Sequence, residues 1–224
     1  MNLPKAFLFD LDGVLLDTED LHSEAWTRAA ASCGTKLNKK QLMFLKGRRR
    51  MECAELVTEW VKKTISVKDF LKLHQPISRE LMGNARAMSG AENLIKWCSD
   101  NKLPMALVTS STSSSVDVKS DSHGWLKLIQ TRVNGDDVAL MKGKPNPDPF
   151  LLAANKLGVD PKLCWALEDS VAGTNAALAA GCKVWVINKE LNKSEKSNQT
   201  MNPTHIRYLD EVLEELQNLS KINS

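Results

Sequence analysis

The sequence has little net charge, no long apolar run and no closely spaced pair of cysteines. Its 30 basic and 27 acidic residues leave a net charge of +3, which is too small to indicate a nucleic-acid-binding surface. The first apolar run is interrupted at Asp10, and residues 1–5 are too short for the charged part of a signal peptide. We therefore expect a cytoplasmic protein that binds neither nucleic acid nor a membrane.

The cysteines do not suggest a disulfide framework. They are odd in number and far apart, at Cys33, Cys53, Cys98, Cys164 and Cys182, so we expect buried free thiols. No internal repeat is present. A chain of 224 residues is long enough for one large domain, or for a core domain with a smaller insertion.

The most informative stretch of the sequence runs from Phe7 to Glu19. The apolar run at residues 6–9 predicts a strand buried in a parallel sheet, and Asp10 and Asp12 follow its carboxyl end. Open α/β sheets bind ligands at that end. Two clustered carboxylates repel each other unless a cation joins them, and such oxygen ligands suit Mg²⁺. Taken alone, the same pattern is also an ordinary turn after a strand.

Residues 17–83 show only helical patterns, whereas the rest of the chain alternates strands with helices. Within residues 17–83 we predict helices at residues 19–33, 39–46, 51–63 and 67–82. Beyond them we predict strands at 105–109, 131–134, 164–167 and 183–187, and helices at 91–101, 148–157, 171–180 and 209–219. This alternation predicts an α/β fold with a doubly wound, Rossmann-like parallel sheet. We expect a core domain of residues 1–16 and 84–224, and an inserted all-α cap domain of residues 17–83.

Two segments depart from this regular pattern. A helix is expected near residues 114–128, but residues 121–124 indicate a break or an extra turn within it. Residues 188–202 are polar, and we expect a loop there before the last strand and helix.

Three further polar clusters follow predicted core strands. Thr109, Ser110 and Ser111 come after one strand, Lys144 lies in a loop rich in glycine and proline, and Glu168 and Asp169 end another strand. Each has a plain structural explanation, because hydroxyls and carboxylates cap helices and loop lysines are usually solvated. Together with Asp10 and Asp12, however, they place two acidic pairs, hydroxyls and a lysine at the strand ends of one sheet.

These clusters resemble the four motifs of the haloacid dehalogenase superfamily. The matching residues are Asp10-Leu-Asp12-Gly, Thr109, Lys144 in Gly-Lys-Pro-x-Pro, and Glu168-Asp169-Ser-x-x-Gly. The string Asp-Gly-Val-Leu-x-Asp-Thr-Glu resembles the first motif of one branch of that superfamily, the β-phosphoglucomutase-like and sugar-phosphate phosphatases. Members of this branch carry a small helical cap. The resemblance implies a Mg²⁺-dependent phosphomonoester hydrolase that acts on a small phosphorylated metabolite, such as a sugar phosphate, through an aspartyl-phosphate intermediate.

The resemblance also implies a role for each motif residue. Asp10 would be the nucleophile, and Asp12 the general acid and then the general base. Mg²⁺ would be held by Asp10, the Asp12 carbonyl and Asp169, with Glu168 a ligand or bonded to a metal-bound water. The phosphate oxygens would be bound by Thr109, the Ser110 amide and Lys144.

The cap carries the question of the substrate. The resemblance implies that Thr18, His22, Lys46 and Arg50 face the core site. From the residues alone, His22 fits a partly buried helix position equally well, Trp26 a core position and residues 48–50 a solvated turn. Two alternative functions stay open: a mutase that moves the phosphoryl group between hydroxyls of a hexose phosphate, and a non-catalytic phosphometabolite-binding protein. We expect a monomer.

Overall fold

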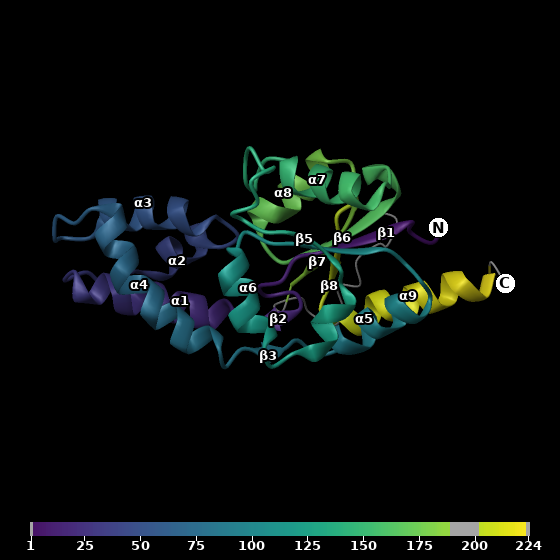
Figure 1. Ribbon diagram of the computed structural model, residues 1–224, viewed down its shortest axis with the longest axis horizontal. Coiled ribbons are helices and arrows are strands. Elements are labelled where there is room, and N and C mark those ends of the chain that lie inside the picture. The colour runs from purple at the N-terminus through teal and green to yellow at the C-terminus, as the bar shows by residue number, and fades with distance from the viewer. Residues whose placement is uncertain (1, 189–201, 223–224) are drawn as a thin grey trace.

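A computed structural model describes residues 2–188 and 202–222 of the chain and contains a parallel sheet of six strands (Figure 1). Across the sheet the strands lie in the order β5 (Thr131–Val133), β4 (Met105–Val108), β1 (Ala6–Phe9), β6 (Cys164–Glu168), β7 (Lys183–Ile187) and β8 (Thr204–Ile206). This confirms the predicted Rossmann-like α/β fold. Of the predicted polar loop at residues 188–202, residues 189–201 lie outside the described part of the chain.

The side chains of β1 alternate between the two faces of the sheet. Phe7 and Phe9 belong to the apolar cluster under α5 (Ala91–Asp100) and α9 (Leu209–Ile222), whereas Ala6 and Leu8 belong to the cluster under α7 (Asp148–Leu157) and α8 (Val171–Ala179). Figure 1 shows these two helix pairs on opposite sides of the sheet. Both faces of β1 are therefore buried, as the unbroken apolar run predicted.

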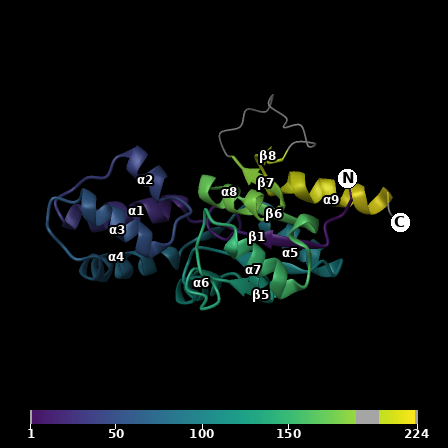
Figure 2. The ribbon, with the colours of Figure 1, turned by 90° about the horizontal axis from the view of Figure 1, so that it is seen from above.

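Four helices form a separate unit at one end of the molecule (Figure 2). They are α1 (Glu19–Ser32), α2 (Lys39–Leu45), α3 (Arg50–Trp60) and α4 (Val67–Met82). Their apolar side chains, including Trp26, Val57 and Phe70, form a cluster of their own, and α1 packs against α4. The division into a core of residues 1–16 and 84–224 and a cap of residues 17–83 stays a prediction.

A short antiparallel pair of strands joins the helical unit to the sheet. It consists of β2 (Leu16–Asp17) and β3 (Arg86–Ala87), with Leu16 opposite Ala87. The chain enters the helical unit directly after β2 and returns directly before β3. We did not predict these strands, since two residues are too few to show a period of two.

The segment after β4 is a broken helix, as predicted. It consists of α6 (Ser113–Ser120) and the 3₁₀ helix η1 (Gly124–Leu128), and a second 3₁₀ helix, η2 (Pro161–Leu163), precedes β6. Elsewhere the predicted bounds differ by a few residues; α3, for example, ends at Trp60 because Val61 has an extended backbone. All five cysteines are buried and free, as expected. Among the described helices, none has the length and apolarity needed to cross a bilayer.

Candidate active site

The strand order brings the predicted motif residues to one edge of the sheet. Since β1 lies between β4 and β6, Phe9 pairs with both Leu107 and Leu167. The three strands therefore end level with one another, and the residues that follow them meet at that edge. Lys144 reaches the same place from the loop before α7.

Lys144 lies between two carboxylates. Its ammonium group is buried and donates hydrogen bonds to Asp10 Oδ1 at 2.5 Å, to the Val108 carbonyl at 3.0 Å and to Glu168 Oε1. Burial alone would lower the pKa of Lys144, but Asp10 and Glu168 together raise it above the usual value. Lys144 is therefore a fixed positive charge beside the Asp10 carboxylate.

Asp10, Glu168 and Asp169 form an acidic cluster. Each offers one carboxylate oxygen, and the three oxygens lie within 4.8 Å of one another. Burial raises the pKa of Asp10 well above its usual range; Lys144 opposes this shift and the neighbouring carboxylates add to it. Burial also raises the pKa of Asp169 to about 7. Crowded buried carboxylates of this kind fit a divalent cation with oxygen ligands.

Gly13 allows Asp169 to approach the turn that follows Asp12. The residue has a φ of +82°, and a Cβ atom there would overlap the Asp169 carboxylate. Both the backbone conformation and the space thus require glycine at this position.

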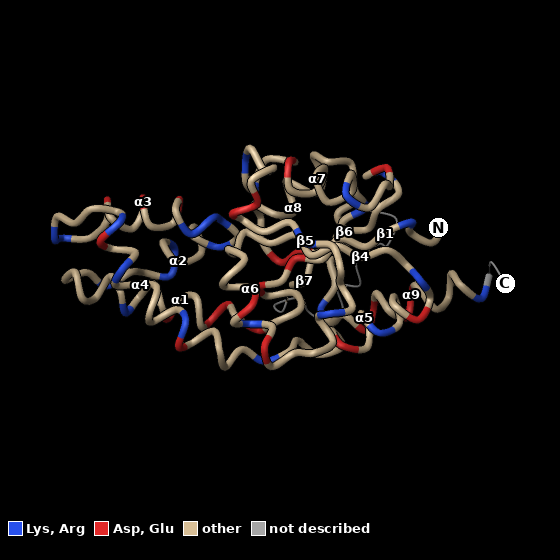
Figure 3. Tube along the Cα trace, viewed as in Figure 1, with Lys and Arg blue, Asp and Glu red and all other residues tan. Residues whose placement is uncertain are grey.

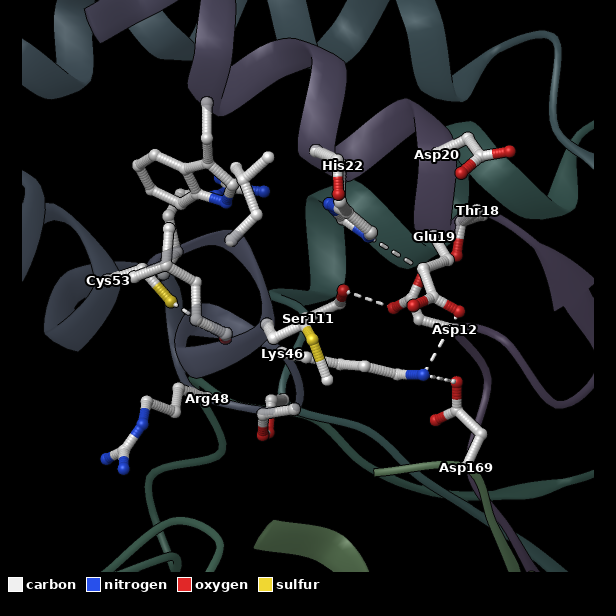
Figure 4. A pocket seen from close by; sticks show the side chains of 18 of the residues that line it. Asp12, Thr18, Glu19, Asp20, His22, Lys46, Arg48, Cys53, Ser111 and Asp169 are labelled. Carbon is white, nitrogen blue, oxygen red and sulfur yellow. Dashed lines mark hydrogen bonds and ion pairs between the residues drawn. The ribbon is translucent and has the colours of Figure 1, made fainter. Parts of the chain in front are cut away.

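The carboxylate of Asp12 lies outside this cluster and is bound by four side chains. Lys119 donates to both of its oxygens, at 2.6 and 2.7 Å, and Ser111 donates to Oδ2 at 2.8 Å. Thr18 and His22 bind Oδ1, at 2.7 and 3.0 Å (Figure 4). Burial would raise the pKa of Asp12, but Lys119 and His22 hold it well below its usual range. Asp12 is therefore an oriented anion in this structure.

Lys119 is part of the site but was not predicted. It lies in α6 with its side chain fully buried, and it also donates to Ser111 Oγ at 2.8 Å. One signal in the sequence could have indicated it: Lys119 follows the apolar Val116 by three residues, so the two share the buried face of a helix. A lysine on such a face needs a charged partner.

Two of the predicted phosphate-binding residues make contacts that stabilise the edge of the sheet. Thr109 is buried, and its Oγ1 accepts a hydrogen bond from the Ser111 amide at 3.1 Å. The Ser110 hydroxyl donates to the Gly47 carbonyl, in the link between α2 and α3, at 2.9 Å. Ser110 therefore joins the helical unit to the sheet.

The four predicted cap residues all lie at this site. Thr18 and His22 bind the Asp12 carboxylate. Lys46 Nζ lies 3.0 Å from Glu19 Oε2 and 3.0 Å from Asp169 Oδ2 (Figure 4). Arg50 lines the same cavity. Figure 3 shows that basic residues gather on the link between α2 and α3, on the side of the helical unit nearest the sheet. That link thus faces the acidic cluster.

A cavity of about 370 Å³ lies between the sheet edge and the helical unit. Asp10, Asp12 and Thr109 line its core side. On the cap side it is lined by His22, Lys46 and Arg50, and also by Trp26 and His74, which we did not predict as site residues. The volume is in the range of pockets that bind small molecules.

A family model described as haloacid dehalogenase-like hydrolase matches residues 4–181. The chain belongs to this family. The assignment agrees with the resemblance seen in the sequence.

Two curated proteins show the relationship at the level of sequence. The chain is 34% identical over 198 residues to the probable pseudouridine-5'-phosphatase of Drosophila melanogaster, covering 85% of this chain and 84% of that protein. It is 31% identical over 183 residues to the bifunctional riboflavin kinase/FMN phosphatase of Arabidopsis thaliana. That match covers 81% of this chain and 48% of the Arabidopsis protein, so the chain spans about half the length of that relative.

Two solved structures are similar along almost the whole chain. A family IA, variant 3 hydrolase of the same superfamily from Entamoeba histolytica has a TM-score of 0.79 and 27% identity, covering 99% of this chain and 100% of that one. The β-phosphoglucomutase of Clostridium difficile has a TM-score of 0.79 and 24% identity, covering 98% and 100%. The second match shows that the fold is shared.

Proposed function

We propose that the chain is a Mg²⁺-dependent phosphomonoester hydrolase that acts on a small phosphorylated metabolite, such as a sugar phosphate. The observation that carries this proposal is the buried Asp10 carboxylate, which lies beside Lys144 and within the acidic cluster. The names of the two curated relatives, which describe phosphatases of small metabolites, support the same class of reaction.

In the first half-reaction Asp10 attacks the phosphorus atom in line with the ester oxygen. A bond forms between an Asp10 oxygen and phosphorus while the bond from phosphorus to the ester oxygen breaks, which leaves an aspartyl-phosphate and an alcohol. Lys144, Thr109 and the Ser110 amide bind the remaining phosphate oxygens, where negative charge is spread in the transition state.

Asp12 moves the proton in both half-reactions. It first donates a proton to the departing ester oxygen. It then takes one from the water that attacks the aspartyl-phosphate; the water oxygen bonds to phosphorus while the bond from Asp10 to phosphorus breaks, which releases phosphate and restores the Asp10 carboxylate. Its low pKa keeps the carboxylate ionised, the form that accepts a proton in the second step. An anionic phosphate nearby raises the pKa of Asp12 and so favours the protonated form that the first step needs. Lys119, Thr18 and His22 hold the carboxylate in position throughout.

The acidic cluster fits a magnesium ion by its chemistry. Asp10, Asp169 and the Asp12 carbonyl would hold it, with Glu168 as a further ligand or bonded to a metal-bound water. Its positive charge, when bound, lets the anionic Asp10 approach an anionic phosphate. Asp10 thus serves both as ligand and as nucleophile.

Thr18, His22, Lys46 and Arg50 select the substrate from the cap side of the cavity. Lys46 and Arg50 supply positive charge there, while Thr18 and His22 lie against Asp12, where the leaving alcohol departs. In a mutase, a second hydroxyl would take the phosphoryl group from Asp10, and a bisphosphate would accumulate. The phosphatase relatives favour water as the acceptor.

Measuring phosphate release from sugar phosphates, nucleotides and phosphoglycolate, with and without Mg²⁺, tests the proposal. We expect at least one compound to be hydrolysed in the presence of Mg²⁺, and Asp10→Asn to abolish that activity. Asp137→Asn is the matched control, because Asp137 pairs with Lys156 away from the site. Equal phosphate release by the wild type and Asp10→Asn would overturn the mechanism.

A further inference from the structure

His74 is a buried histidine at the edge of the cavity, and it has no hydrogen-bond partner in the part of the chain that the structure describes. It lies in α4 with 1% of its surface exposed, and neither ring nitrogen has a partner among residues 2–188 and 202–222. Its ring stacks on Trp26, with 3.7 Å between the ring centroids and 19° between the planes. Both residues line the cavity that also contains Asp10 and Asp12.

Packing alone does not explain a histidine at this position. Phe70 and Ser78 lie one turn before and one turn after it on the buried face of α4, and neither of them bonds the imidazole. Buried polar groups in native proteins nearly always have hydrogen-bond partners. An imidazole without such a partner among the described residues, on the wall of a cavity, therefore indicates a bound ligand as its partner.

The chemistry of His74 limits what that partner is. Burial lowers the pKa of His74 to about 3, and electrostatic interactions with Arg50 and His22 add to this shift. The ring is therefore neutral near pH 7 and offers one donor and one acceptor. A hydroxyl group matches this pair, since it also donates and accepts. An ionised phosphate group does not, because it only accepts hydrogen bonds and would leave the acceptor nitrogen of the ring without a donor.

We propose that His74 is a specificity-determining residue that hydrogen-bonds a hydroxyl group on the alcohol part of the substrate. This inference rests on the proposed function, in which the phosphate lies at the core side of the same cavity. Stacking on Trp26 fixes the plane of the imidazole and so the direction of its hydrogen bonds. The favoured substrates are phosphate monoesters whose alcohol carries at least one further hydroxyl group.

The test compares two substrates across three variants. The hydroxylated probe is whichever of ribose 5-phosphate, glucose 6-phosphate and sorbitol 6-phosphate the wild type hydrolyses fastest, and the second probe is p-nitrophenyl phosphate, whose alcohol has no further hydroxyl. We expect His74→Leu to lower kcat/KM for the hydroxylated probe about tenfold, mainly through KM, and to change it less than about twofold for p-nitrophenyl phosphate. His74→Gln keeps a donor and an acceptor, so it should recover part of the loss.

Phe70→Leu is the matched control, because it alters packing against the same Trp26 without removing a hydrogen-bonding group. It should leave the ratio of kcat/KM between the two probes unchanged. An equal loss for both probes in His74→Leu, or no loss for either, would overturn the inference. Deoxy analogues of the hydroxylated probe test it on the wild type alone: at least one should lose about tenfold in kcat/KM, and no loss for any of them would contradict the proposal.

Failure of this inference is distinguishable from failure of the proposed function. If the wild type hydrolyses p-nitrophenyl phosphate in a reaction that needs Asp10 and Mg²⁺, but the ratio between the probes does not depend on His74, only the role of His74 is wrong. If no probe is hydrolysed, or Asp10→Asn is as active as the wild type, the proposed function is wrong and the role of His74 falls with it.

Discussion

Lys119 donates hydrogen bonds to both carboxylate oxygens of Asp12, although 107 residues separate the two in the chain. The lysine side chain is fully buried, and that of Asp12 is 21% exposed. Such a contact fixes the orientation of the Asp12 carboxylate and favours its charged form. The residue proposed to transfer the proton thus depends on a helix that none of the four sequence motifs includes.

Replacing Lys119 with methionine should slow turnover and shift its pH dependence. Without the ammonium group the pKa of Asp12 rises, so the anionic form is lost at a higher pH than in the wild type. We expect kcat to fall roughly a hundredfold and the acidic limb of its pH profile to move to higher pH. Lys119→Arg keeps the charge and should move the limb less. Lys156→Met, which breaks the remote pair with Asp137, should leave the profile unchanged; an unshifted limb in Lys119→Met would contradict this role.

Gly13→Ala and Gly34→Ala should differ in their effects on activity. Both glycines have a positive φ, of +82° and +76°, so the backbone conformation alone should lower the free energy of unfolding by about 1–2 kcal/mol in each variant. Only at Gly13 would the new Cβ overlap the Asp169 carboxylate, whereas none of the described residues lies within 4 Å of such an atom at Gly34. Urea unfolding together with phosphate release measures both effects. We expect Gly13→Ala to lose Mg²⁺-dependent activity and Gly34→Ala to keep it, and equal activity in the two variants would contradict the placement of Asp169.

Stabilisation by Mg²⁺ should be greater at pH 8 than at pH 6. The pKa of Asp169 is raised to about 7, so at pH 6 a proton competes with the cation for this carboxylate, while at pH 8 the carboxylate is already ionised. The increase in Tm on adding Mg²⁺ measures the difference. Asp169→Asn should remove most of that increase, and Asp137→Asn should not. An increase of the same size at both pH values, retained in Asp169→Asn, would show that the ion binds elsewhere.

His74 should make the protein less stable below pH 6.5. Its pKa is about 3 in the folded chain and near 6.5 in the unfolded chain, so the unfolded state binds the proton first as the pH falls. The stability from this group is fully present above pH 6.5, and at pH 5 about 2 kcal/mol of it should be lost. Urea unfolding of the wild type and of His74→Leu at pH 7.5 and pH 5 measures how much of the loss of stability is due to His74. His205→Gln, at an exposed histidine in β8, is the control. A loss of equal size in His74→Leu would contradict the low pKa.

Much of the fold and most of the proposed catalytic residues could be predicted because their signals are local. The apolar run before Asp10 marks a strand by itself, and the alternation of strands and helices then brings Thr109, Lys144 and Glu168 to the same edge. The strands β2 and β3 were missed because each has only two residues and is formed by pairing with a distant segment.

The two site residues that were not predicted act through distant contacts. Lys119 and His74 lie on helix faces that bury apolar side chains, so a local pattern indicates that they are buried but not which groups they contact. Only the folded chain shows that Lys119 meets Asp12 and that His74 borders the cavity without a hydrogen-bond partner among the described residues.

A single-turnover reaction with a substrate carrying radiolabelled phosphate, quenched in acid, tests most directly whether Asp10 forms a covalent intermediate. We expect transient label on the wild-type chain, located at Asp10 by peptide mapping. The label should persist longer in Asp12→Asn if its first step still proceeds, because that variant lacks the base that activates water, and it should be absent from Asp10→Asn. Release of phosphate by the wild type with no label on the chain, together with full activity of Asp10→Asn, would contradict the account.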